Sequence, residues 1–435
     1  MNDFKKDVVS GVKWTTLGTI ILALVGIVKL SVLARFLDKA DFGLMALVTF
    51  VMGFMNLFND MGLTSAILHK QNITAKQYAS LYWLNIGFSL LLYILLCGLT
   101  PLVSLFYGEP QLNILIPLLG LNLLISAIGR IFKTIQSKHL KFKAITIFEI
   151  ISAVISLCFA IYLAMNDYGV YTLVYSALLQ YSLQNLMYLI YGLKKYGLLL
   201  HFKYFETKPF LKIGMYQVGG QIVNYFNRDL DILIIGKFFS QDILGGYSMA
   251  RELVRRPVSV FGPIINKVGA PTLALYTHKI EELKSNFLEL VKIVASISIP
   301  LYFLLLIFAE PIVMIIYGEK FLSIVFLVRV LCINMIFRFV GGTIGNLVTA
   351  TGRTDLEFKW NLITLSIIPF FIFAASFYSI NFVAISVTMV SLILYYPSWK
   401  FFVKRLINVS FMEYNRAFFS VSLKWLKSLL LNGRK

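Results

Sequence analysis

The chain consists of long apolar stretches separated by short connections that carry most of its charge. The stretch from Trp360 to Trp399 contains no Asp, Glu, Lys or Arg over 40 residues. Because a membrane-spanning helix needs about 20 mainly apolar residues, this stretch holds two spans, and residues 378–381 are the expected turn between them. Hydrophobic residues make up 58% of the chain and charged residues 14%, against about 45–50% and 25% in soluble domains. The pattern predicts an all-α polytopic membrane protein without a sizeable soluble domain.

The same length criterion divides the chain into about twelve transmembrane helices, although ten or fourteen remain open. The expected spans are residues 14–37, 42–68, 79–105, 112–136, 144–165, 168–193, 209–236, 243–275, 288–316, 321–350, 360–378 and 381–400. The basic N-terminus runs into a long apolar stretch followed by further spans, which is typical of a first transmembrane helix and not of a cleaved signal. Residues 404–435 mix aromatic with basic residues and predict an amphipathic helix on the inner membrane surface, with a disordered basic tail as the alternative.

The net charge of +19 is distributed as it is in a membrane protein and not as it is in a nucleic-acid-binding protein. Of the 40 Lys and Arg residues, 27 fall in the termini, in one alternating set of connections or at the adjoining span ends. Only Lys39, Lys237 and Lys320 fall in the other set of connections, and the remaining ten lie within the expected spans. Positively charged connections stay in the cytoplasm. We therefore expect a multi-pass protein of the bacterial cytoplasmic membrane with both termini in the cytoplasm, and no nucleic-acid partner.

A nine-residue motif occurs twice. Residues 101–109 (PLVSLFYGE) match residues 311–319 (PIVMIIYGE) at an offset of 210 residues. Six expected spans separate the copies, so the two halves enter the membrane in the same sense, and they predict two six-helix lobes with the substrate handled between them. The expected lobes are residues 1–205 and 206–403, followed by the tail 404–435, and the internal duplication means that a monomer would suffice.

Cofactor motifs are missing from the sequence. Its three cysteines and four histidines are isolated, and no ATP-binding loop of the form GxxxxGK[ST] occurs. We expect no cofactor, no bound metal and no catalytic residues.

Polar and charged residues inside the expected spans mark the candidate site, because such residues face a wet cavity or a partner. The seventh span carries Gln217, Gln221, Asn224, Arg228 and Asp231 at spacings of three and four, which places them on one helix face. Arg251, Glu252 and Arg255 lie on the eighth span. Lys29 lies on the first span, Asp60 on the second and Arg338 on the tenth. Permanent ion pairs that hold helices together are the structural alternative.

Cations outnumber acids within the spans by four, which predicts a cavity that prefers an anion. Arginine is the commonest of these cations, and its guanidinium group matches phosphate oxygens. The acids Asp60, Asp229, Asp231 and Glu252 are candidates for binding a coupling Na⁺ or H⁺, with local charge balance as the alternative.

Two segments resemble the opening motifs of polysaccharide flippases in the multidrug/oligosaccharidyl-lipid/polysaccharide exporter superfamily. The first is Leu33-Ala34-Arg35-Phe36-Leu37 followed by Asp41-Phe42-Gly43-Leu44. The second is Asn227-Arg228-Asp229 with Asp231, followed by Gly246-Tyr247 and Ala250, with Pro257 and Pro263 further on. The resemblance covers residues 8–403.

This resemblance implies a V-shaped exporter of two six-helix lobes that carries a polyprenyl-diphosphate-linked oligosaccharide across the membrane. It also implies membrane lipid and polysaccharide assembly proteins as partners. By the same resemblance, Lys29, Arg228, Arg251, Arg255 and Arg338 are candidates for contacting the diphosphate.

Two other functions remain as alternatives. A cation-coupled drug antiporter of the same fold would favour an acidic cavity, which the positive surplus disfavours. A membrane glycosyltransferase or polymerase would need a large external loop, whereas the expected external connections here are only a few residues long.

Overall fold

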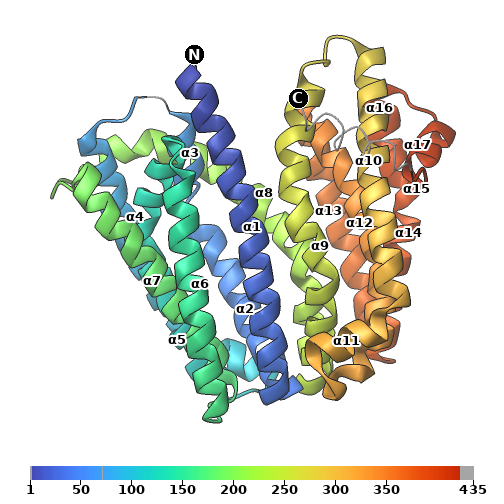
Figure 1. Cartoon of the computed structure of the whole chain (residues 1–435), viewed down its shortest axis with the longest axis horizontal. Coiled ribbons are helices and arrows are strands. Elements are labelled where there is room, and N and C mark those ends of the chain that lie inside the picture. The colour runs from blue at the N-terminus through green and yellow to red at the C-terminus, as the bar shows by residue number, and fades with distance from the viewer. Residues whose placement is uncertain (1, 71, 422–435) are drawn as a thin grey trace. The chain divides into compact units, whose positions relative to one another are not determined.

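The computed structural model describes residues 2–70 and 72–421, and every regular element in this part of the chain is helical (Figure 1). Nine helical segments among these residues are long and apolar enough to cross a membrane. The all-α prediction is therefore confirmed. The chain folds into two compact units, residues 1–245 (unit 1) and 246–435 (unit 2).

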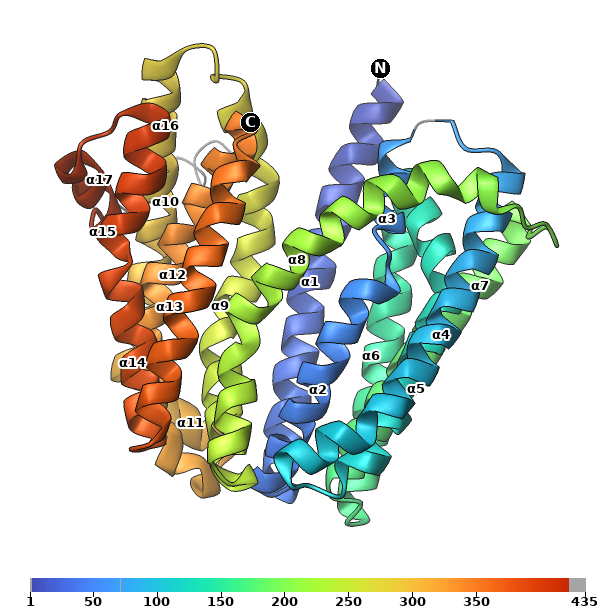
Figure 2. The ribbon, with the colours of Figure 1, turned by 180° about the vertical axis from the view of Figure 1, so that it is seen from behind.

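Unit 1 contains eight helices and the first residues of a ninth. They are α1 (Asn2–Phe36), α2 (Lys39–Asn59), α3 (Leu63–His69), α4 (Ala75–Tyr107), α5 (Leu112–Lys138), α6 (Phe142–Met165), α7 (Val170–Tyr196), α8 (Tyr204–Phe238) and the start of α9 (Gln241–Ala274). In this unit α5 packs against both α4 and α7, and α6 packs against α1 and α7. Figure 2 shows α8 running beside α2.

Unit 2 contains the rest of α9 and the helices that follow it. They are α10 (Ile280–Ile307), α11 (Ala309–Tyr317), the short 3-10 helix η1 (Glu319–Ile324), α12 (Val325–Thr351), α13 (Thr354–Ser376), α14 (Ile380–Ile393), α15 (Tyr395–Ser398), the π-helix η2 (Trp399–Lys404), α16 (Arg405–Ile407) and α17 (Phe411–Phe418). Within this unit α12 packs against α10 and α14.

Each of the twelve expected spans corresponds to one helix or to a run of consecutive helices. The charge-free stretch turns at residues 377–379, where Ser379 caps α14 by accepting a hydrogen bond from the backbone N–H of Phe382. The expected second span is interrupted, because Met61 and Gly62 both have positive φ and separate α2 from α3. The expected ninth span breaks at Phe308, since Pro311 has no N–H to donate to the carbonyl of Ile307.

The nine-residue repeat ends its helix in the same way in both copies. Tyr107 ends α4 and Tyr317 ends α11, and each is followed by a glycine with positive φ. Gly108 donates to the carbonyl of Ser104 at 2.9 Å, and Gly318 donates to the carbonyl of Met314 at 3.0 Å. The duplication therefore extends to the hydrogen bond that terminates each helix. The repeat divides the sequence near residue 205, whereas the contacts divide the chain after Gly245, because α8 packs on the helices of unit 1.

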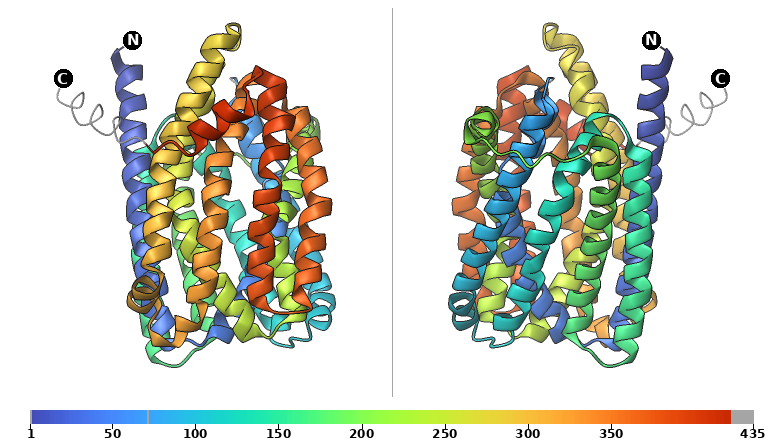
Figure 3. Two further views of the ribbon diagram at one scale, coloured as in Figure 1. Left: turned by 90° about the vertical axis from the view of Figure 1, so that its right-hand side faces the viewer. Right: turned by 90° about the vertical axis from the view of Figure 1, so that its left-hand side faces the viewer.

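The first part of the expected tail forms the short helix α17. Ser410 and Glu413 form a capping box at its start, and the buried rings of Tyr414 and Phe418 lie on its inner face. Figure 3 shows α17 against α10, where the rings of Tyr414 and Phe287 stack with centroids 6.3 Å apart. Residues 422–435 of the expected tail lie outside the described residues.

Candidate functional site

Helix α8 is fastened to α2 by aromatic residues on one of its faces. The Tyr225 hydroxyl donates to the carbonyl of Phe50, and its ring lies 5.5 Å from that of Phe50. A side chain at Gly53 would collide with Tyr225, because a Cβ there would lie 2.7 Å from the hydroxyl oxygen. The ring of Phe226 also packs on Phe54, at 5.6 Å. These contacts fix which face of α8 turns towards unit 1.

Three of the five polar residues predicted on one face of α8 are exposed, whereas Asp231 at the end of that row is buried. Gln221, Asn224 and Arg228 are all exposed, whereas Tyr225 is buried. The side chain of Gln217 lies outside the described part of the structure. The sequence therefore identified a helix face that presents amide and guanidinium groups to its surroundings.

Arg228 lies beside both an acid and an aromatic ring. Its guanidinium group contacts Asp229 Oδ2 at 2.7 Å and lies 5.6 Å from the centroid of the Tyr225 ring. The arginine side chain is 51% exposed, and that of Asp229 is 13% exposed. The guanidinium group of Arg228 is therefore half-exposed, and Asp229 contacts it on one side.

Two further candidate acids have partners within unit 1. Asp60 follows the last residue of α2, accepts a 2.5 Å hydrogen bond from Thr64, and lies 4.0 Å from the guanidinium group of Arg130. Asp231 is only 7% exposed, and its carboxylate accepts a hydrogen bond from the backbone N–H of Ile232 at 3.0 Å. Both carboxylates therefore have local donors.

Lys29 lies in the contact between α1 and α6. Its ammonium donates to Ser156 Oγ at 2.9 Å, and Ser156 in turn donates to the carbonyl of Ser176 on α7. This geometry makes Lys29 part of a chain of hydrogen bonds that links three helices.

In unit 2, two tyrosines hold the proline-containing helix α9. Tyr302 on α10 donates to the carbonyl of Val254 at 2.9 Å, and Tyr317 on α11 donates to the carbonyl of Met249 at 3.2 Å. Both tyrosines are buried. These two hydrogen bonds hold the backbone of α9 at residues 249 and 254, next to its charged residues 251, 252, 255 and 256.

The candidate charges of unit 2 lie on α9 and α12. Glu252 forms an ion pair with Arg256 at 2.7 Å, one helical turn further along. Arg251 and Arg255 are half-buried, and Arg338 on α12 is exposed. The partner of the candidate acid Glu252 is therefore Arg256, which the sequence analysis did not include in the site.

Sequence analysis missed a cluster around Glu149 on α6. Its carboxylate accepts hydrogen bonds from Lys133 at 2.8 Å, Tyr188 at 3.1 Å and Gln184 at 3.3 Å. Lys133 lies on α5 and the other two donors on α7, so the cluster joins three helices. An acid within an apolar span was the only available signal, because its partners depend on which helices are neighbours.

A second missed network is uncharged and buried. Asn59 accepts a 2.6 Å hydrogen bond from Ser89 and donates to Ser126 Oγ at 3.2 Å, while Asn85 donates to the carbonyl of Ala127 at 3.1 Å. These bonds join α2, α4 and α5. Such contacts hold membrane helices together where no water is present to satisfy polar groups.

No group of three or more His, Cys, Asp or Glu residues arranged to hold a metal ion occurs within the described ranges. The described ionisable clusters consist of cations paired with carboxylates.

Comparison of the sequence with known proteins gives a consistent set of relatives. Residues 32–326 match the family model described as polysaccharide biosynthesis protein. The chain is 27% identical to the lipopolysaccharide biosynthesis protein WzxC of Escherichia coli K12, over 94% of this chain and 84% of that protein. It is 29% identical to the teichuronic acid biosynthesis protein TuaB of Bacillus subtilis 168, over 86% of this chain and 78% of that protein.

Comparison of the structures identifies the fold. A multidrug resistance transporter of the MATE family, in an inward-facing conformation, superposes with a TM-score of 0.73 at 14% identity, over 88% of this chain and 94% of that one. The lipid II flippase MurJ, in an inward closed conformation, superposes with a TM-score of 0.71 at 14% identity, over 97% and 93%. The chain is therefore an all-helical polytopic membrane protein with the fold shared by these transporters, as the sequence predicted.

Proposed function

Because the chain belongs to the polysaccharide biosynthesis protein family, we propose that it is a flippase for a polyprenyl-diphosphate-linked oligosaccharide. The coarser function follows from its relatives: it is a membrane transport protein of polysaccharide biosynthesis. The proposal adds the cargo, the direction from the cytoplasmic to the outer leaflet, and alternating access by two six-helix lobes, residues 1–205 and 206–403.

The observation that carries the proposal is the exposed polar face of α8. Gln221, Asn224 and Arg228 are exposed and lie within about 60° of one another around α8, beside the Tyr225 contact, in a helix of a membrane transporter. A guanidinium and two amides in such a row suit a cargo with an anionic diphosphate and many hydroxyl groups. The names of two similar proteins support this cargo: WzxC is a lipopolysaccharide biosynthesis protein, and MurJ is a lipid II flippase.

The candidate residues then divide into three roles. Arg228 in unit 1 and Arg251, Arg255 and Arg338 in unit 2 contact the diphosphate as charged donors. The amides of Gln221 and Asn224, with Gln217 on the same helix, contact the sugars. Lys29 serves the packing of α1 on α6, because its ammonium already donates to Ser156.

An ion gradient supplies the free energy of transport in this proposal, with Na⁺ or H⁺ as the coupling ion. Asp231 is the strongest of the four coupling candidates, since it is the most buried of them. Asp229, Glu252 and Asp60 each have a guanidinium group within 4.0 Å, which supports charge balance as their role. The protein acts as a monomer in the cytoplasmic membrane, with both termini in the cytoplasm and polysaccharide assembly proteins as its partners.

Reconstitution tests the proposal directly. Purified protein in liposomes, given a fluorescent lipid-linked oligosaccharide, should move it between leaflets, as measured by quenching with a reagent that cannot cross the bilayer. Arg228→Ala should lower the rate by about tenfold or more, because a hydrogen bond to a charged group contributes about 1.5–3 kcal/mol.

Lys76→Ala is the matched control, since it removes an exposed cation of α4 without touching α8. Equal rates for the wild type and Arg228→Ala would remove the arginine from the mechanism. Transport of an organic cation, with no movement of the lipid-linked oligosaccharide, would assign the protein to drug antiport instead.

A further inference from the structure

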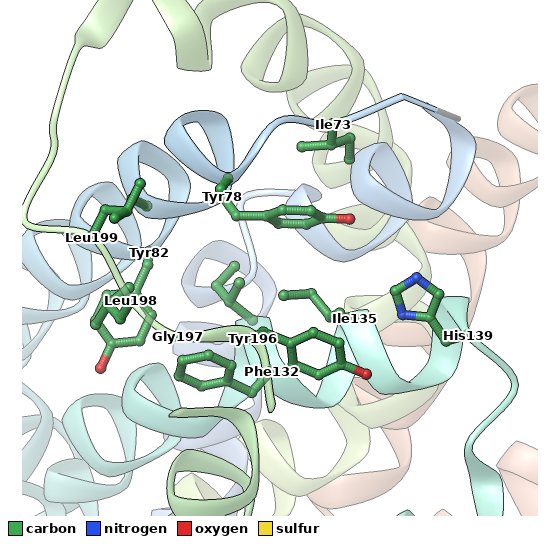
Figure 4. Close-up of a pocket in the computed structure, with 13 residues that line it drawn as sticks. Ile73, Tyr78, Tyr82, Phe132, Ile135, His139, Tyr196, Gly197, Leu198 and Leu199 are labelled. Carbon is green, nitrogen blue, oxygen red and sulfur yellow. The ribbon is translucent and has the colours of Figure 1, made fainter. Parts of the chain in front are cut away.

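A pocket of about 300 Å³ opens at one end of unit 1, and none of the residues assigned above to cargo or coupling ion lines it. It lies between the first turns of α4, the last turns of α5, and the segment that follows α7 (Figure 4). Tyr82, Phe132 and Ile135 are nearly fully buried in its walls. The pocket therefore offers an apolar, preformed space to a ligand.

One edge of this pocket is polar, and two lysines, Lys138 and Lys195, lie beside it. Figure 4 shows the hydroxyl groups of Tyr78 and Tyr196 directed to the side where His139 lies. The imidazole of His139 stacks on the Tyr196 ring with centroids 5.8 Å apart and planes 17° apart, and the Lys195 ammonium lies 5.6 Å from the same ring. Lys138, the neighbour of His139, donates to the carbonyl of Lys70 in the adjacent loop. A ligand with an apolar chain and an anionic group would match a pocket with apolar walls and a polar edge.

The segment that closes the pocket exposes large apolar side chains. Leu200 is 92% exposed and Phe205 83% exposed, and Phe202 and Tyr204 beside them are exposed as well. Contiguous exposed apolar residues mark a contact surface, and aromatic residues interspersed with cations are typical of the membrane interface. In the orientation proposed above, this end faces the inner leaflet.

The segment is held in place by hydrogen bonds to α4. Trp83 Nε1 donates to the carbonyl of Leu199 at 3.1 Å, and the Ser80 hydroxyl donates to Glu206 at 2.7 Å while accepting from the backbone N–H of Lys203 at 3.1 Å. His201 adds a 3.1 Å contact to the same carboxylate. The pocket wall is thus fixed by the fold before any ligand arrives.

We propose that this pocket binds an anionic phospholipid of the surrounding leaflet. One acyl chain lies among Tyr82, Phe132 and Ile135, and the phosphate lies at the polar edge formed by His139 and Tyr196, within reach of Lys195 beside it. The exposed segment 200–205 sits in the headgroup layer beside it. The lysines beside the polar edge favour an anionic over a zwitterionic lipid, since basic residues near a membrane surface attract anionic headgroups. The site is independent of the proposed cargo.

Native mass spectrometry of the delipidated full-length protein tests this assignment. The probes are phosphatidylglycerol, phosphatidylcholine and a polyprenyl phosphate, each titrated separately. We expect one phosphatidylglycerol to be retained more tightly than phosphatidylcholine. Stronger retention of polyprenyl phosphate than of phosphatidylglycerol in this pocket would overturn the proposal and assign the pocket to the cargo lipid.

Two variants locate the bound lipid. Ala75→Trp introduces an indole at an exposed lining position and should reduce phosphatidylglycerol affinity about tenfold by filling the pocket. Lys195→Gln should reduce it about fivefold, while Lys194→Gln, about 100° away around the same helix, should leave it unchanged. Wild-type affinity in both Ala75→Trp and Lys195→Gln would refute the site. A melting temperature for each variant checks that it has folded, and Lys195 is exposed enough for its replacement to be tolerated.

Discussion

Glu149 is a carboxylate that three donors from two neighbouring helices surround inside unit 1. Replacing it by Gln would leave the Lys133 ammonium without its acid and weaken the hydrogen bond from Tyr188. A hydrogen bond to a charged group contributes about 1.5–3 kcal/mol, and one to a neutral group about 0.5–1.5 kcal/mol. We therefore expect Glu149→Gln to lower the melting temperature of the detergent-solubilised protein.

The pairing with Lys133 can be isolated by a double-mutant cycle. Lys133→Met combined with Glu149→Gln should destabilise the protein by less than the sum of the two single variants, because each single variant removes the same ion pair. Strict additivity would indicate that the 2.8 Å contact contributes nothing to stability.

Glu413 predicts a pH dependence outside the membrane spans. Hydrogen bonds from the backbone N–H and the hydroxyl of Ser410, together with the Lys284 ammonium, lower the pKa of Glu413 to about 2 from an ordinary value of 4.5. A lowered pKa in the folded state means that the stabilisation is present above about pH 4.5 and disappears as the pH falls towards 2.

Hydrogen exchange of residues 411–418 measures this effect. Exchange should be faster in Glu413→Gln than in the wild type at pH 6, and the difference should shrink as the pH falls to about 3, after correction for intrinsic exchange rates. A difference of constant size across this range would show that the carboxylate charge does not hold α17.

For single residues, the sequence predicted which helix face a side chain occupies better than it predicted the residue that the side chain contacts. The aligned amides and arginine of α8 were visible because helical spacing alone places Gln221, Asn224 and Arg228 on one face. The contact of Lys29 with Ser156 joins residues 127 positions apart, and no local pattern contains that information. Finding such partners requires knowing which helices are neighbours.

The starts of α2 and α9 approach each other closely, and all residues concerned belong to unit 1. A Cβ at Gly43 would lie 2.1 Å from the carbonyl oxygen of Gln241, and one at Gly245 would lie 1.8 Å from that of Lys39. Both obstacles are backbone atoms, which cannot move aside as a flexible side chain can. Gly43→Ala and Gly245→Ala should therefore lower the melting temperature and the yield of folded protein.

Gly98→Ala serves as the matched control for these two variants. Gly98 is exposed on α4, and a Cβ there would meet nothing within 4 Å. Because Ala has the higher helix propensity, by about 1 kcal/mol, this variant should be neutral or slightly stabilising. A melting temperature for Gly43→Ala equal to that of Gly98→Ala would contradict the close approach.

Helix boundaries illustrate which elements a sequence can define. Charge-free length located the turn between α13 and α14, since two spans must fit between Trp360 and Trp399. The break between α2 and α3 was not predicted, because Met61 adopts a positive φ that its residue type does not favour. Tertiary packing, and not local preference, determines that break.

For the molecule as a whole, apolar length and charge distribution established the fold class, while the close similarity to transporters at 14% identity shows how little sequence the fold requires. Within the described residues, three expected spans are too polar or too highly charged to count among the nine apolar membrane-crossing segments: α7, α8 and α9. Of these, α8 and α9 carry most of the candidate site. A helix that lines a polar pathway loses apolar character for that reason, so function weakens the signal by which such spans are found.

The distribution of basic residues makes a prediction about orientation that the whole chain must satisfy. The test uses a variant in which the native residues Cys97, Cys158 and Cys332 are replaced by Ala. Single cysteines are then introduced as Ser240→Cys, in the connection between α8 and α9, and as Lys141→Cys, in the basic connection before α6. Both positions are exposed. If positive connections stay inside, a membrane-impermeant maleimide should label Ser240→Cys in intact cells and should label Lys141→Cys only after the membrane is opened. The reverse pattern would place the basic pocket end of unit 1 outside the cell, and with it the leaflet assigned to the phospholipid.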